Sequence, residues 1–154
     1  MDGLPSDWIG KIFSDSLIEV MSKTTSFSLT ARPEPRDGKM YDNVGAMTLN
    51  SRKSGAVFIS ADEADMRVVC SYMTGAAKDE VTPEDELDAL CEIVNMTAGN
   101  AKVRIDDPEY KYSLTPPFVI SGKSLSITTK KRSQVVSMIL SCEEISFKLM
   151  ILFY

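Results

Sequence analysis

The chain has 154 residues and a formal net charge of -5, so it is long enough for one ordinary domain and too short for two. This acidic balance offers no basic patch for phosphate backbones, which makes nucleic acid and anionic membranes poor partners. Histidine is absent, which excludes a Ser-His-Asp or Cys-His nucleophile pair, an imidazole base and His-ligated zinc.

Apolar runs and cysteines predict the compartment. The longest apolar stretch, Leu149–Tyr154, is far below the roughly 20 residues of a membrane-spanning helix. Met1–Ser6 lacks the basic and apolar regions of an export signal. Cys70, Cys91 and Cys142 are odd in number and lie within apolar patterns, as expected of buried thiols in a reducing compartment. We therefore expect a cytoplasmic protein.

The first half of the chain alternates amphipathic helices with short apolar strands. In chain order, we expect a helix at Asp7–Lys23, strands at Ser26–Arg32, Val44–Asn50 and Gly55–Ser60, and a helix at Glu63–Tyr72. The charged segment Pro33–Asp42 has the composition of a loop. Gly75 is the residue type that ends helices, so the second helix is expected to stop there.

A third helix is predicted from Thr82 to about Arg104, because Thr82 can cap it and Pro83 suits the first turn. Strands are then expected at Phe118–Ser121, Leu125–Thr129, Gln134–Cys142 and Ile145–Phe153, with turns at Gly122-Lys123, Lys131-Arg132 and Glu143-Glu144. Consecutive strands with short turns favour antiparallel pairing. The predicted fold class is α+β, an antiparallel sheet packed against long helices in a single domain, residues 1–154.

Two stripes run along the third helix. The apolar stripe, at core-facing spacing, consists of Leu87, Leu90, Cys91, Val94, Ala98, Ala101 and Ile105. The polar stripe, within roughly 80° on the opposite side, consists of Asp88, Glu92, Asn95, Gly99 and Lys102. The polar stripe is open to two interpretations, a solvated helix face or a functional surface.

Two residues of the polar stripe favour the functional interpretation. Asn95 and Gly99 are poor helix formers, whereas a merely solvated face favours Glu, Lys or Ala. Gly99 leaves room beside Asn95 for the approach of another protein's backbone. Glu92 and Asn95 together offer an acceptor for a lysine and an amide that can hold a water molecule.

A family resemblance follows from the same helix. The segments Asn95-Met96-Thr97-Ala98-Gly99-Asn100 and Thr115-Pro116-Pro117-Phe118 resemble the signature of the CheC/CheX/FliY chemotaxis phosphatases. That signature is Asp or Ser, three residues, Glu, two residues, Asn, and a proline about twenty-two residues later. Asp88, Glu92, Asn95 and Pro117 match it, although Pro117 lies one position early, so Pro116 or Pro117 could be the matching proline.

The number of signature copies points to one branch of this family. CheC- and FliY-like members carry two copies. The first helix of this chain has Asp15, Glu19 and Ser22 at the same spacing, with Ser22 in place of the amide, and so resembles a degenerate copy. One intact site is similar to CheX, and this resemblance implies a homodimer.

The resemblance also implies a mechanism, the hydrolysis of phosphoaspartate on a phosphorylated CheY-type chemotaxis response regulator. Asn95 is expected to orient the attacking water and Glu92 to pair with a lysine of the receiver domain. Asp88, Gly99 and Pro117 are expected to support them. The receiver is expected to supply Mg²⁺, so we expect no cofactor and no metal site on this chain. The alternatives are a non-catalytic binding module for a receiver or flagellar-switch protein, and a structural switch component.

Overall fold

The computed structural model describes residues 5–34, 38–130 and 133–154, so the predicted turn at Lys131-Arg132 lies outside the described residues. Its elements are α1 (Pro5–Thr25), β1 (Thr30–Pro33), β2 (Asn43–Leu49), β3 (Gly55–Ala61), α2 (Glu63–Thr74), the 3₁₀ turn η1 (Lys78–Glu80), α3 (Pro83–Arg104), β4 (Phe118–Ser121), β5 (Gln134–Ser141) and β6 (Ser146–Phe153).

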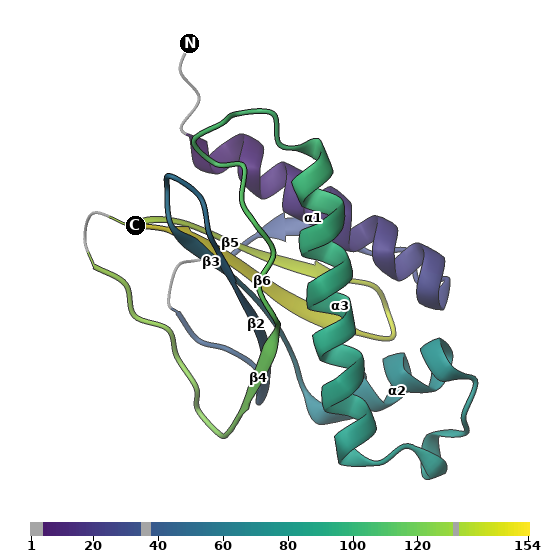
Figure 1. Cartoon of the computed structure of the whole chain (residues 1–154). Coiled ribbons are helices and arrows are strands. Elements are labelled where there is room, and N and C mark those ends of the chain that lie inside the picture. The colour runs from purple at the N-terminus through teal and green to yellow at the C-terminus, as the bar shows by residue number, and fades with distance from the viewer. Residues whose placement is uncertain (1–4, 35–37, 131–132) are drawn as a thin grey trace.

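The strands form one six-stranded sheet in the order β1-β5-β6-β3-β2-β4, and every neighbouring pair is antiparallel. Helices α1 and α3 cross over this sheet, and α2 lies beside the N-terminal half of α3 (Figure 1). The predicted α+β class with an antiparallel sheet is therefore confirmed.

Alternation along the strands gives each face of the sheet its own apolar cluster. On β3, for example, Val57 and Ile59 belong to the main core shared with the three helices. Ala56 faces the opposite way, into a smaller cluster with Val44 of β2. Leu125 and Ile127 pack against this smaller cluster, so the segment between β4 and β5 covers part of the face that the helices leave open.

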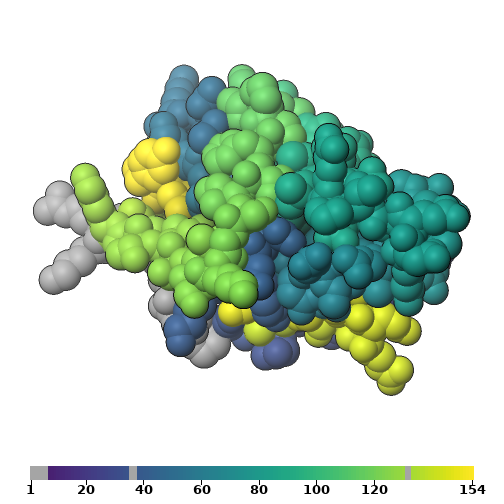
Figure 2. All heavy atoms as spheres, turned by 90° about the horizontal axis from the view of Figure 1, so that it is seen from below, coloured from purple at the N-terminus to yellow at the C-terminus, as the bar shows by residue number. Residues whose placement is uncertain are grey.

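The predicted strand Leu125–Thr129 is wrong. The segment makes only an isolated bridge between Ser126 and Lys39, with backbone hydrogen bonds to Gly38 and Met40. Its alternating apolar residues indicated an extended, half-buried chain. That chain lies over one face of the sheet, where Leu125 and Ile127 pack against the smaller apolar cluster. Figure 2 shows this yellow-green segment projecting at the end of the molecule opposite α2.

Other boundaries shift by small amounts. The predicted strand Ser26–Arg32 begins only at Thr30, because α1 continues to Thr25 and Ser26 has a positive φ of 69°. The buried Phe27 in this connection gave it the apolar pattern of a strand. The second helix does end at Gly75, which adopts the left-handed conformation.

Candidate functional site

Helix α3 has a well-defined beginning. The backbone N–H of Asp85 donates to the Thr82 hydroxyl (3.1 Å), and the Thr82 N–H donates to the Asp85 carboxylate (3.0 Å). These reciprocal bonds form a capping box, and the hydrogen bond from the Thr82 backbone lowers the pKa of Asp85. The 22-residue helix that follows is about 33 Å long and presents its outward side chains on a regular frame.

The inward face of α3 is held against the sheet at Gly45 of β2. A Cβ at Gly45 would lie 2.6 Å from Val94 Cγ2 and 3.0 Å from Leu90 Cγ, so only glycine permits this approach. The predicted apolar stripe is buried at Leu90, Val94, Ala98, Ala101 and Ile105, but Leu87 and Cys91 are only half-buried. Ala89, Ile93 and Thr97 are buried instead, since α1 and α2 also pack on this helix.

Both halves of α3 are braced by neighbouring helices. Arg67 of α2 donates to the 2% exposed Glu86 near the N-terminal end (3.1 Å). Toward the other end, Arg104 pairs with Glu19 of α1. The buried Tyr112 hydroxyl donates to the Ala98 carbonyl oxygen (2.5 Å), one turn beyond Asn95, and burial raises the pKa of Tyr112.

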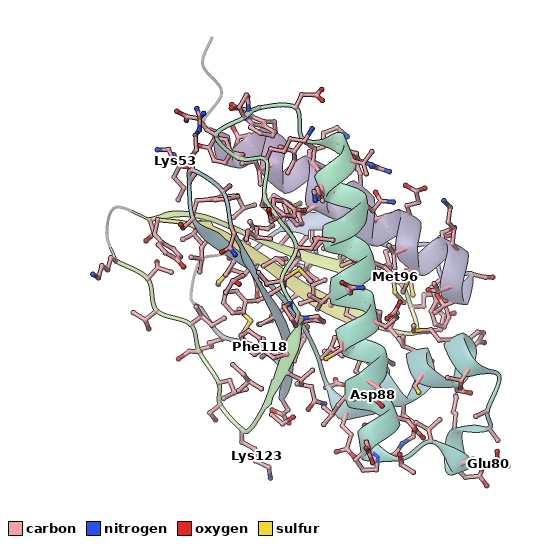
Figure 3. The ribbon with its side chains drawn as sticks, in the orientation of Figure 1. Lys53, Glu80, Asp88, Met96, Phe118 and Lys123 are labelled. Atoms are coloured by element: carbon pink, nitrogen blue, oxygen red, sulfur yellow. The ribbon has the colours of Figure 1, made fainter. Side chains whose placement is uncertain are left out.

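The outward face of α3 carries the predicted site residues. Asp88, Glu92 and Asn95 are exposed, and Gly99 and Lys102 are partly exposed. Among the described residues, none forms a hydrogen bond or ion pair with Glu92 or Asn95. Figure 3 shows Asp88 on the N-terminal half of α3, with Met96 further along the same helix and Phe118 on the neighbouring strand β4. Glu92 and Asn95 therefore lie about one turn apart on a helix that its neighbours hold in place, and both side chains are available to another molecule.

The proline segment enters the sheet next to α3. Pro117 is half-buried and Pro116 is exposed, and both directly precede β4. In β4, Val119 lies opposite Gly45, the residue on which α3 rests. The Thr115 hydroxyl donates to the Thr48 carbonyl oxygen (2.9 Å), which holds the segment before β4 against β2. Both prolines thus precede a strand that contacts α3, and the choice between them stays open.

In the degenerate copy on α1, both acidic residues are already engaged. Asp15 pairs with Lys11 at 2.9 Å. Glu19 pairs with Lys23 at 2.6 Å, accepts from Asn100 Nδ2 at 3.2 Å and pairs with Arg104. The hydrogen bond from Lys23, followed by that from Asn100, lowers the pKa of Glu19. This carboxylate serves as a bridge between α1 and α3.

The residues around Glu92 and Asn95 do not favour thiol or metal chemistry. Burial, and then the charge of Asp88, raise the pKa of the Cys91 thiol, which makes it a weak nucleophile. In the described part of the chain, no three His, Cys, Asp or Glu residues gather as metal ligands. A hollow of about 470 Å³ between α1, β1 and β5 is lined by residues such as Gly10 and Met138 and does not include Glu92 or Asn95.

Two features of α3 were missed by the sequence reasoning. One is the contact of Asn100 and Arg104 with Glu19, which joins residues more than 80 positions apart. The other is Val103, which is 82% exposed on the outward face. Val103 directly follows Lys102 of the polar stripe, so an apolar residue at the edge of that stripe was a visible signal, whereas no local pattern indicates a contact between distant helices.

Comparison with known proteins connects this site to a family. The family model "Chemotaxis phosphatase CheX" matches residues 43–141, more than half of the chain and the whole of α3. The chain belongs to the CheX family of chemotaxis phosphatases. This membership assigns it, at the family level, to hydrolases. No curated protein matches the chain in sequence.

Solved structures of CheX proteins share the fold. CheX from Vibrio vulnificus superposes with a TM-score of 0.81 at 23% identity, over 96% of this chain and 99% of its own. CheX from Desulfovibrio desulfuricans gives 0.82 at 19% identity, with the same coverage. A CheX-CheY-BeF3-Mg²⁺ complex from Borrelia burgdorferi gives 0.74 at 18% identity, over 94% of this chain and 97% of the matched chain.

Across the described residues, no helix is both long and apolar enough to cross a membrane.

Proposed function

We propose that this CheX-family chain removes the phosphoryl group from the phosphorylated aspartate of a CheY-type response regulator in the cytoplasm. The observation that carries the proposal is the pair Glu92 and Asn95, exposed and unengaged on the braced helix α3. The partner class is supported by the Borrelia burgdorferi neighbour, which is a complex with CheY.

The chemistry requires little of this chain beyond positioning. Water attacks the phosphorus atom, the bond to the aspartate oxygen breaks, and phosphate and a free carboxylate are released. The Asn95 amide holds this water in line, so that the reacting atoms meet in the productive geometry. Glu92 pairs with a receiver lysine that neutralises phosphoryl oxygens, and this ion pair fixes the docking. Mg²⁺ on the receiver supplies the remaining charge stabilisation.

Three further residues support this arrangement in the proposal. Asp88 lies about one turn before Glu92 and adds negative charge on the same exposed face. Gly99 has no side chain and so leaves space for the receiver beside Asn95. Pro117 limits the conformations of the chain that enters β4 beside α3.

The direct experiment is to follow the loss of acyl phosphate from a purified, phosphorylated chemotaxis receiver with and without this chain. The proposal expects the chain to accelerate the loss at substoichiometric amounts, since each molecule turns over. A receiver that loses phosphate at the same rate in both samples would contradict it. Binding without acceleration would favour the alternative, a non-catalytic module for a receiver or flagellar-switch protein.

A homodimer is part of the same proposal. The edge strand β4 leaves backbone groups unpaired on one side, and its Phe118 and Ile120 are 46% and 45% exposed, as suits a surface that another chain covers. Light scattering at micromolar concentration should give about twice the 17.0 kDa of one chain. A monomer mass would contradict the dimer and leave the phosphatase proposal intact.

A further inference from the structure

Gly99 is not required by the folding of its own chain. A Cβ added at Gly10, Gly45 or Gly55 would lie 2.7, 2.6 or 2.5 Å from another atom, so close packing explains these three glycines. Apart from its chain neighbours and the backbone of its own helix, a Cβ at Gly99 would meet no atom within 4 Å, and the Gly99 backbone is helical. Alanine is the better helix former at such a position. The glycine therefore leaves a space that no described part of this chain fills.

The space at Gly99 is a notch with four surrounding side chains. On a helix the neighbours of Gly99 are Asn95 and Met96 in the preceding turn, and Lys102 and Val103 in the following turn. Helical side chains lean toward the N-terminus, so Val103 and Lys102 lean over Gly99. The Val103 side chain is 82% exposed, the highest fraction among the large hydrophobic side chains of the described residues.

We propose that this Gly99 notch receives an apolar side chain of the receiver and helps to select it. The inference rests on the proposed function and extends it from the reacting pair to a specificity surface. Val103 lies eight residues from Asn95, which is about 12 Å along the helix axis. An interface of ordinary size covers about 800 Å² of each partner, which corresponds to a radius of about 16 Å. A receiver centred on Asn95 therefore reaches Val103.

The position of Asn95 decides between a receiver and a second copy of this chain as the occupant. Asn95 lies about one turn before Gly99 on the same helix face, so a molecule docked at the notch also approaches Asn95. A second copy would block the group that must meet the phosphorylated aspartate, whereas a receiver brings that aspartate to the group. Met96 and Val103 give two corners of the notch an apolar character, and burying them contributes to docking.

The test uses Gly99→Ala and Val103→Ala. Each change should raise the stability of the chain and lower its affinity for the receiver, so an effect on docking cannot be mistaken for a loss of folding. Both changes introduce a better helix former. A Cβ at Gly99 meets no neighbouring side chain within 4 Å, and Val103 is 82% exposed, so each change should raise the melting temperature by about 3 °C. Each should weaken binding of the chain to a BeF3-Mg²⁺-loaded CheY-type receiver by about tenfold. KM should rise by a similar factor, with kcat at saturating receiver close to the parent's.

Ser22→Ala provides the matched control. Ser22 is exposed on α1, and alanine improves helix formation there too, so stability should rise without a change in receiver affinity. Unchanged affinity for both α3 variants, with a parent that binds and hydrolyses, would overturn the notch and leave the proposed function standing. A fall in kcat without a change in Kd would also overturn it. A parent that neither binds nor hydrolyses would overturn the proposed function, and the notch with it.

Discussion

Helices α1 and α3 carry acidic residues at the same spacing but use them differently. On α1, Glu19 accepts from Asn100 and pairs with Lys23 and Arg104. On α3, Glu92 is exposed and makes no such contact within the described residues. The glutamate of α1 thus contributes to the packing of two helices, and the glutamate of α3 is available to another molecule. A sequence motif identifies candidates, and only unengaged, exposed candidates can meet a partner.

The largest effect is expected from Asn95→Ala. If the amide holds the attacking water, its removal should lower kcat by about 100-fold or more with near-normal receiver binding, because a water-orienting group acts mainly in the transition state. The measurement is the rate of acyl phosphate loss at saturating receiver, with the far-UV spectrum as a check on folding. A fully active variant would exclude Asn95 as the catalytic group.

The control for this change is its counterpart on α1. Ser22→Asn, introduced into the Asn95→Ala chain, restores the amide at the equivalent spacing beside Glu19. It should restore no activity, because Glu19 remains engaged with Lys23 and Asn100. Recovery of activity would show that the two helices are functionally interchangeable and that the engagement of Glu19 is unimportant.

A smaller effect is expected from Glu92→Gln, which keeps the shape and removes the charge. Losing an ion pair in a partly desolvated interface costs on the order of 2 kcal/mol, about 30-fold in Kd, and leaves the receiver lysine unpaired. Both affinity for a BeF3-Mg²⁺-loaded receiver and kcat/KM should therefore fall. Glu19→Gln, the matched change on α1, should alter neither. Equal behaviour of the two variants would remove the distinction between the helices.

The smallest effect is on the pH dependence of stability. Hydrogen bonds from Lys23 and Asn100 lower the pKa of Glu19 in the folded chain from its usual 4.5. The ionised Glu19 therefore stabilises the fold above pH 4.5, and this contribution is lost as the pH falls through the lower folded-state pKa. Urea unfolding should show Glu19→Gln less stable than the parent at pH 7, with the gap closing below pH 4.5. A gap that is the same at pH 7 and pH 3 would contradict this role.

Local patterns succeeded where neighbouring residues alone decide the structure. The cap at Thr82 and the first-turn Pro83 predicted the start of α3, and the structure begins it at Pro83. The polar stripe likewise predicted that Asp88, Glu92 and Asn95 share one face, since helical periodicity fixes which side chains lie together. The roles of these residues in catalysis stay predictions, because exposure alone does not test them.

Local patterns failed where distant segments compete for the same surface. Leu125 and Ile127 alternate as residues of a strand do, yet their segment makes only one isolated bridge, and both side chains pack on the face of the sheet instead. Thr97 belongs to neither predicted stripe of α3, yet it is fully buried. The width of the buried face depends on how many elements pack on the helix. The sequence of α3 alone does not predict how many elements do so.

The amino-acid sequence alone predicts the helices, the antiparallel pairing of most strands and a spacing of Asp88, Glu92 and Asn95 that places them on one helix face. These follow from backbone periodicity and capping, which act over a few residues. The folded chain is needed to see that Glu19 is engaged while Glu92 is not, and that Gly99 faces open space while Gly45 lies against Val94. Contacts between residues 80 or more positions apart arise from packing, so the difference between a structural carboxylate and an available one exists only in the folded chain.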